Sequence, residues 1–234
     1  MDFSNRTVVI TGAAGNLGQA LAKGFAGAGA NLVLVDLDAN RLKSVFGADN
    51  EKRSLVAVNL LKREEAQRVI DVARQRFRKI DVLCNIAGGF RMGEAVHETS
   101  DETWDFLFNL NVRTLLNAVR AAVPALIETG GGKVVNVGAA GALKGGAMMG
   151  AYAAAKSVVI RLTEAMSAEL RERNINVNCV LPTIIDTPEN RAAMPDADPM
   201  RWVAPADLAR TIMYLASDDA RAIHGAAVPV AGRS

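Results

Sequence analysis

Short runs of apolar and β-branched residues recur along the chain, and each is followed by a longer stretch in which apolar positions have helical spacing. The runs predict seven strands, at Thr7–Thr11, Asn31–Asp36, Ser54–Asn59, Ile80–Ala87, Lys133–Val137, Asn174–Leu181 and Ala226–Val230. The helical stretches predict helices at about Leu17–Ala28, Ala39–Val45, Arg63–Phe77, Asp101–Ile127, Ala151–Arg173 and Ala206–Ala216. Several strands are apolar almost throughout, which is typical of strands covered on both faces of a parallel sheet. The alternation predicts an α/β fold, a single doubly wound Rossmann domain over residues 1–234 with a seven-stranded parallel sheet.

A proline-rich segment interrupts this alternation near the end of the chain. Five of the 7 prolines fall within Pro182–Pro205, so the segment is neither one uninterrupted helix nor a central strand. It also carries Met194 and Trp202, whose apolar side chains require cover. Two interpretations stay open, a surface loop wrapped on the core or a substrate lid over about residues 183–205.

Composition and charge limit the classes of function. The chain has 234 residues, of which 50% are apolar and 22% charged, and its net charge is +2. So small a charge argues against nucleic acid or a membrane surface as a partner. The two cysteines, Cys84 and Cys179, and two distant histidines exclude a disulfide framework and predict no metal site. Because no apolar run approaches about 18 residues and the first strand begins near Thr7, we expect a cytoplasmic protein without a cleaved signal.

A glycine-rich loop follows the first predicted strand. The sequence Thr11-Gly12-Ala13-Ala14-Gly15-Asn16-Leu17-Gly18 leads directly into a helix. Glycine lets the backbone turn sharply and approach a phosphate closely, and the following helix offers free N–H groups and the positive end of its dipole. The pattern predicts a dinucleotide site in which Gly12, Asn16, Leu17 and Gly18 wrap the pyrophosphate.

Asp36 ends the second predicted strand. A carboxylate there accepts both hydroxyls of an adenosine ribose and repels the 2′-phosphate of NADP. No arginine or lysine occurs in the glycine loop or in the four residues after Asp36, so we expect NAD(H) as the cofactor. The alternative is that Asp36 makes an Asx turn at the strand end or, with Asp38, starts the next helix.

Tyr152 and Lys156 lie four residues apart in a predicted helix, so they share one face of it. A phenol with a pKa of about 10 is a poor acid or base at neutral pH. A neighbouring ammonium and an oxidised nicotinamide ring both stabilise the phenolate, and we expect them to bring the pKa of Tyr152 towards working pH. The pairing therefore predicts an acid–base catalyst.

In these motifs the chain resembles the short-chain dehydrogenase/reductase family from about Arg6 to Gly232. Asn85-Ile86-Ala87-Gly88 matches the family's Asn-Asn-Ala-Gly strand end with one substitution, and Asn111 stands where the family has a helix asparagine. The resemblance implies that Asn111 supports a water beside Lys156 and that Asn59 and Leu60 contact the adenine. Further residues that it places at the cofactor are Asn85, Ala87, Gly88, Pro182, Ile184 and Thr187.

Departures from the family pattern are informative. Asn16 replaces the middle glycine of the loop, Thr183 follows Pro182 where glycine is usual, and Ala139 stands at the position of the catalytic serine. Losing that one hydrogen-bond donor to a developing oxyanion typically costs about 2.7–4 kcal/mol. Quinonoid dihydropteridine reductase, an atypical member of the family, resembles this chain locally here. A quinonoid pterin is a conjugated acceptor that delocalises the developing charge, so its reduction depends less on the missing hydroxyl.

Two hypotheses follow. The first is an NAD(H)-dependent oxidoreductase that transfers a hydride between nicotinamide and a small carbonyl, hydroxyl or conjugated pterin- or quinone-like substrate, with Tyr152, Lys156 and Asn111 as its catalytic residues. The second, motivated by Ala139, is a non-catalytic NAD(H)-binding redox sensor or scaffold. The helix Ala151–Arg173 is apolar on two opposing faces, at Val158 and Ile160, which together with the family resemblance predicts a homodimer or homotetramer. The alternative is cover by a loop of the same chain.

Overall fold

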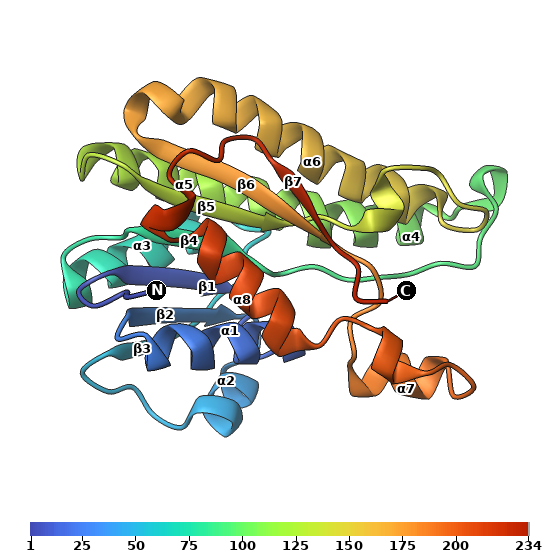
Figure 1. The fold of residues 1–234 in the computed structure, drawn as a ribbon, viewed down its shortest axis with the longest axis horizontal. Coiled ribbons are helices and arrows are strands. Elements are labelled where there is room, and N and C mark those ends of the chain that lie inside the picture. The colour runs from blue at the N-terminus through green and yellow to red at the C-terminus, as the bar shows by residue number, and fades with distance from the viewer. Residues whose placement is uncertain (234) are drawn as a thin grey trace.

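The computed structural model describes residues 1–233, which contain one seven-stranded parallel sheet in the order β3-β2-β1-β4-β5-β6-β7 (Figure 1). The strands are β1 (Thr7–Thr11), β2 (Asn31–Asp36), β3 (Arg53–Ala57), β4 (Val82–Asn85), β5 (Gly132–Val137), β6 (Ile175–Pro182) and β7 (Ala227–Val230). The predicted doubly wound α/β class is thus confirmed. The strand order reverses between β1 and β4, and a reversal of this kind opens a crevice at the carboxyl ends of the strands.

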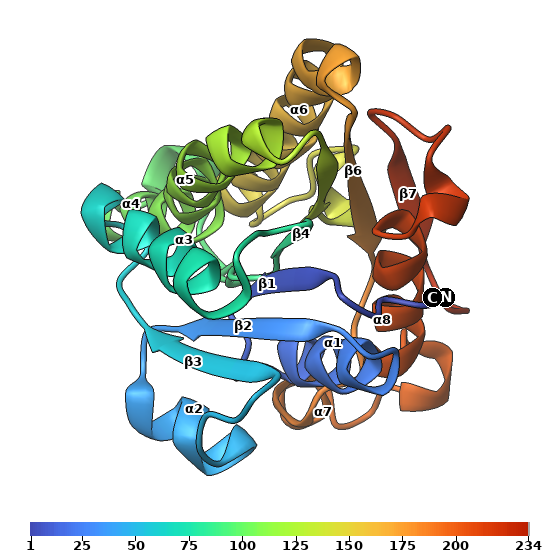
Figure 2. The ribbon, with the colours of Figure 1, turned by 90° about the vertical axis from the view of Figure 1, so that its left-hand side faces the viewer.

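Helices cover both faces of the sheet. They are α1 (Asn16–Gly27), α2 (Ala39–Phe46), α3 (Arg63–Phe77), α4 (Asp101–Phe108), α5 (Thr114–Glu128), α6 (Gly150–Leu170), α7 (Pro188–Ala193) and α8 (Pro205–Leu215). Figure 2 shows α1 and α8 on one side of the sheet and α3, α5 and α6 on the other. Alternate residues of a strand serve the two layers, because Val8 and Ile10 pack with α1 and α8 whereas Val9 packs with α3 and α5. This explains why the strands are apolar on both faces.

One predicted helix is divided in the structure. The single helix expected over Asp101–Ile127 consists of α4, a π-helical turn at Asn109–Arg113, and α5. In this turn the Thr114 N–H donates to the Asn109 carbonyl, five residues earlier. The Asn111 side-chain amide donates to the Leu107 carbonyl at 2.9 Å, which in a regular helix receives the backbone N–H of Asn111. Spacing alone does not reveal this competition for a carbonyl, and such turns are frequent at functional sites.

Strand β4 is shorter than expected. The prediction extended it over Ile80–Ala87, but pairing with its neighbours stops at Asn85. The backbone N–H groups of Ile86 and Ala87 donate instead to the Thr11 hydroxyl, at 3.0 and 3.1 Å. The chain therefore leaves the sheet here, at the carboxyl end of β1 and beside the glycine loop.

The proline-rich segment is broken as the sequence predicts. It contains α7 and a short 3₁₀ turn at Pro199–Arg201, and Ile185 bridges Val203. Trp202 and Val203 are buried, so the end of the segment is packed on the core.

Candidate active site

A cleft of about 1380 Å³ runs along the carboxyl ends of the strands. Predicted site residues that line it are Gly12, Asn16, Leu17, Gly18, Asp36, Asn59, Leu60, Ala87, Gly88, Tyr152, Lys156, Pro182, Ile184 and Thr187. They come from segments distant in the sequence, and the crossovers of the sheet bring them to one edge. The volume exceeds that of a typical drug-sized ligand pocket, about 300–1,000 Å³, and suits a dinucleotide together with a substrate.

The glycine loop fits closely against the end of β4. Gly12 has φ +65°, and a Cβ built on it lies 2.9 Å from the backbone N and Cα of Ala87. A Cβ on Gly18 lies 2.3 Å from the Gly12 carbonyl oxygen. A larger residue at either position must shift backbone. No side chain caps the start of α1, so the described loop presents a helix N-terminus suited to an anion. These features fit a pyrophosphate.

Asp36, Asn59 and Leu60, which we predicted to contact the adenosine, line the cleft. The Asp36 carboxylate accepts the N–H of Ala14 at 3.0 Å and that of Leu37 at 2.8 Å, which ties the end of β2 to the glycine loop. Arg41 also lines the cleft. Arg41 was not among the predicted site residues, because it lies five residues after Asp36, in the first turn of α2.

Tyr152 and Lys156 project from the first turns of α6 into the cleft. Burial raises the pKa of Tyr152 to about 12, and its ring meets Phe90 edge-on with the ring centroids 4.8 Å apart. The Lys156 Nζ donates to the Val137 carbonyl at 2.9 Å. The lowering of the Tyr152 pKa that we expect from this ammonium together with an oxidised nicotinamide applies to the cofactor-bound protein and stays a prediction. Burial lowers the pKa of Lys156 to about 8.

Asn111 approaches Lys156 at Gly88. A Cβ built on Gly88 lies 2.8 Å from the Asn111 Oδ1 and 3.2 Å from the Lys156 Nζ, so only glycine leaves both groups undisturbed. Asn111 is buried, and its amide accepts the Gly89 N–H at 3.1 Å and donates to the Gly89 carbonyl at 3.0 Å. The π-helical turn thus holds the loop after β4 against α6.

The structure places Asn85 beneath the cleft. Its side chain is buried and donates to the Asn136 Oδ1 at 2.8 Å, and Asn136 donates in turn to the Thr163 hydroxyl at 2.9 Å. This chain of hydrogen bonds ties β4 to β5 and α6. We predicted Asn85 at the cofactor site, but its side chain does not line the cleft. It is buried because Asn85 is still the last residue of β4, and the chain leaves the sheet only after it.

Apolar side chains surround Tyr152. Phe90, Met92, Met149 and Met194 line the cleft, as does Ala139, which is buried. Trp202 is packed elsewhere in the core and does not line it. The part of the cleft beside Tyr152, where we expect the substrate, is therefore largely apolar.

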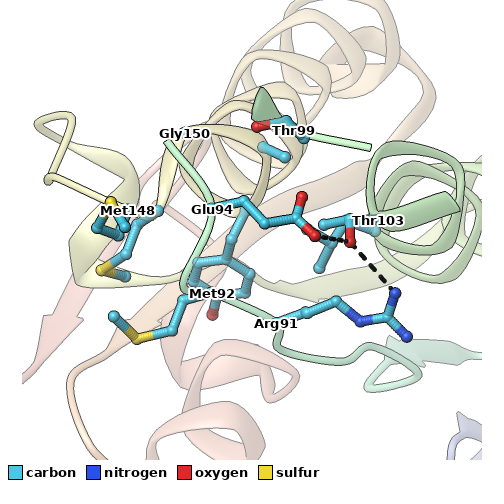
Figure 3. A pocket seen from close by; sticks show the side chains of 11 residues that line it. Arg91, Met92, Glu94, Thr99, Thr103, Met148 and Gly150 are labelled. Atoms are coloured by element: carbon cyan, nitrogen blue, oxygen red, sulfur yellow. Dashed lines mark hydrogen bonds between the residues drawn. The ribbon is translucent and has the colours of Figure 1, made fainter. Parts of the chain in front are cut away.

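A small cavity of about 10 Å³ adjoins this surface and is bounded by Tyr152 (Figure 3). Beside it, the Glu94 carboxylate accepts the Thr103 hydroxyl at 2.9 Å and the Ser100 N–H at 3.0 Å. Arg91 donates to the Thr103 hydroxyl at 3.3 Å. These bonds attach the loop after β4 to the start of α4, and so they hold the segment that carries Phe90 and Met92.

Within residues 1–233, no helix is long and apolar enough to cross a membrane. The same part of the chain holds no group of three or more His, Cys, Asp or Glu placed to bind a metal ion.

Comparison with known proteins agrees with the geometry. A sequence profile described as short chain dehydrogenase matches residues 6–198. The chain is 30% identical over 243 residues to the 3-oxoacyl-(acyl-carrier-protein) reductase FabG of Thermotoga maritima, covering 99% of this chain and 98% of that protein. It is 32% identical over 243 residues to 2-dehydro-3-deoxy-D-gluconate 5-dehydrogenase of Escherichia coli, covering 98% and 95% of the two chains.

A solved structure gives the same result. The crystal structure of 3-ketoacyl-(acyl-carrier-protein) reductase from Brucella melitensis complexed with NADH matches with a TM-score of 0.88 and 29% identity, covering 99% of each chain. The matches extend over nearly the whole chain and include the glycine loop, Tyr152 and Lys156. The chain therefore belongs to the short-chain dehydrogenase/reductase family and is an oxidoreductase that uses a nicotinamide cofactor.

Proposed function

We propose that this protein is an NAD(H)-dependent oxidoreductase in which Tyr152 is the acid–base catalyst and no serine assists it. The observation that carries the proposal is the convergence on Gly88 of the buried Asn111 and of Lys156, which lines the cleft together with Tyr152 and the glycine loop. A non-catalytic sensor requires no such arrangement, and the relatives named above are dehydrogenases and reductases.

Each part of the cleft has a role in this proposal. Gly12, Asn16, Leu17 and Gly18 hold the pyrophosphate, Asp36 holds the adenosine ribose, and Asn59 and Leu60 flank the adenine. Ala87, Gly88, Pro182, Ile184 and Thr187 line the nicotinamide end. When bound, the nicotinamide would supply the hydride transfer and, in its oxidised form, a positive charge.

The protein's own part in the reaction is to hold and move a proton. In the direction of reduction, the Tyr152 hydroxyl donates its proton to the substrate atom that gains negative charge. Lys156, with a pKa of about 8, is still mostly protonated at neutral pH, and its charge favours the phenolate that remains. Asn111 positions the loop after β4, and supports proton exchange with solvent beside Lys156.

Ala139 directs the proposal towards a conjugated substrate. A simple ketone develops charge on one oxygen and depends strongly on preorganised donors. The apolar surface formed by Phe90, Met92, Met149 and Met194 suits a planar acceptor that spreads this charge over a ring. A pterin- or quinone-like compound meets this description, and the local resemblance to quinonoid dihydropteridine reductase supports the same class.

NAD(H) is favoured over NADP(H) by the charge of Asp36. The Asp36 carboxylate lies at the end of β2, where a 2′-phosphate meets like charge. Arg41 in the same cleft is the one feature that favours the phosphate. We expect NADH to bind at least tenfold more tightly than NADPH, and equal dissociation constants contradict this assignment.

Two further roles complete the proposal. The first part of the segment 183–205 lines the cleft and acts as a lid over the substrate. Self-association through α6 to a dimer or tetramer is supported by partly exposed Val158 and Leu162. On the opposite face, however, Ile160 is covered by Cys179 and Leu181 of the same chain. Sedimentation at micromolar concentration tests this, and a single 24.8 kDa species refutes self-association.

The central experiment measures NADH consumption with small ketones, quinones and a quinonoid pterin in parallel, using wild type and Tyr152→Phe. Tyr214→Phe is the matched control, because Tyr214 is the other of the chain's 2 tyrosines and is an exposed residue of α8. We expect Tyr152→Phe to lose most turnover while retaining NADH binding. Unchanged turnover by Tyr152→Phe excludes the proposed acid, and saturable NADH binding without turnover of any acceptor favours the sensor.

A further inference from the structure

Glu189 in α7 bridges the cleft. The Asn16 Nδ2 donates to the Glu189 Oε2 at 2.9 Å, although the two residues are 173 positions apart. Both line the cleft, where the hydrogen bond joins the first residue of α1 to the start of α7. The bond therefore connects the loop proposed to hold the pyrophosphate with the segment proposed to act as a lid.

The Glu189 carboxylate also engages a second group proposed to contact the cofactor. Hydrogen bonds from its own backbone N–H and from the Thr187 and Asn16 side chains, with the nearby charge of Arg41, hold the pKa of Glu189 below its usual range. The carboxylate is therefore charged at neutral pH. Asn16 and Thr187 are thus both occupied by one anionic group of the protein itself.

A pyrophosphate is also anionic, and it requires the same positions. The uncapped start of α1 and the amide of Asn16 form the place that suits it. Two anions at one site repel each other, so the bridge has to open before a pyrophosphate settles there. Glu189 is exposed and has room to move away.

The bridge depends on a departure from the family pattern noted in the sequence. The resembling loops have glycine where this chain has Asn16, and glycine has no side chain to donate to Glu189. The pair is thus a feature of this chain, and the general fold does not explain it.

We propose that Glu189 determines the affinity for the cofactor. Its carboxylate, hydrogen-bonded to Asn16, closes the pyrophosphate end of the cleft and repels the entering phosphates. It is displaced when they bind. The inference rests on the proposed function, because it takes the position of the pyrophosphate from there. Glu189 thus weakens binding of the cofactor and favours its release after each turnover.

The test compares NADH dissociation constants of wild type and Glu189→Gln, measured by NADH fluorescence at low and high salt. Glutamine keeps an oxygen to accept the bond from Asn16 and removes only the charge. We expect Glu189→Gln to bind NADH about three- to tenfold more tightly at low ionic strength. Near 1 M salt, where the Debye length is about 3 Å, the two constants should approach each other. Glu189→Ala, which removes charge and bond, should bind at least as tightly as Glu189→Gln.

Glu172→Gln is the matched control. It removes the same charge from an exposed turn after α6, at the opposite edge of the sheet, and should bind NADH as the wild type does. Equal or weaker NADH binding by Glu189→Gln, or a gain that salt does not reduce, overturns the inference and leaves the proposed function intact. If the folded wild type shows no saturable NADH binding, the proposed function fails and this inference fails with it.

Discussion

Replacing Lys156 with methionine separates the role of its charge in catalysis from its cost to folding. Methionine keeps a long, flexible, apolar side chain and removes the ammonium. Burial lowers the pKa of Lys156 from 10.5 to about 8, and each pKa unit corresponds to about 1.36 kcal/mol. Holding the charged side chain in the folded protein therefore costs about 3 kcal/mol. Loss of the hydrogen bond to the Val137 carbonyl offsets about 1 kcal/mol of the gain. We expect the free energy of unfolding of Lys156→Met at pH 7 to be about 2 kcal/mol higher than that of the wild type.

The same pKa fixes the sign of the pH dependence. Below pH 8 the amine is charged in both the folded and the unfolded chain, so the cost is fully present. Between pH 8 and pH 10.5 the folded chain has released the proton and the unfolded chain still holds it, so wild-type stability rises with pH relative to the variant. Above pH 10.5 both forms are neutral, and the advantage of the variant disappears.

The assay is urea unfolding of both proteins at pH 7 and pH 10, combined with turnover of NADH. Lys156→Met should lose at least about 100-fold in turnover, since the reaction loses the charge that favours the phenolate. Lys133→Met is the control. Its Nζ is also buried, but it lies at the amino ends of the strands with the Asn176 Oδ1 at 2.7 Å and Asp218 at 3.9 Å, and its loss should leave turnover unchanged. A Lys156→Met protein less stable than wild type at pH 7, or a stability difference independent of pH, refutes the reasoning.

Three other substitutions test separate parts of the site. Ala139→Ser restores the missing donor, and should raise kcat/KM on simple ketones about 10- to 100-fold with less effect on conjugated acceptors; equal changes on both contradict the proposed substrate class. Gly18→Ala brings a Cβ to 2.3 Å from the Gly12 carbonyl oxygen and should weaken NADH binding at least about tenfold. Gly27→Ala is the control: its added Cβ meets no atom within 4 Å, so NADH binding and the melting temperature should stay as in the wild type. Asn111→Asp replaces the amide donor with a carboxylate oxygen that faces the Gly89 and Leu107 carbonyls, and should lower the free energy of unfolding by about 2–4 kcal/mol at pH 7. The loss should be smaller in acid, where the carboxyl is protonated, and a pH-independent loss in urea unfolding contradicts this account.

Much of the site is encoded in short stretches of sequence. The glycine loop after β1, the carboxylate at the end of β2 and the Tyr152–Lys156 spacing each depend on a few neighbouring residues, and local backbone geometry fixes how those residues face. The seven strands were likewise readable, because burial on both faces leaves continuous apolar runs. For this reason the sequence predicted the sheet and most of the residues that line the cleft.

The tertiary structure decided what depends on contacts between distant segments. Asn111 and Lys156 both approach Gly88 because the absence of a side chain there leaves room for them, and Asn85 is buried in the sheet because it is the last residue of β4. Burial raises the pKa of Tyr152, and sequence spacing does not reveal this effect, since the desolvation of a phenol depends on every group packed around it. The Asn16–Glu189 bridge, likewise, joins residues 173 positions apart. Sequence spacing determines which side chains share a helix face or a strand end, whereas burial and long-range packing determine which of them touch and in which charge state.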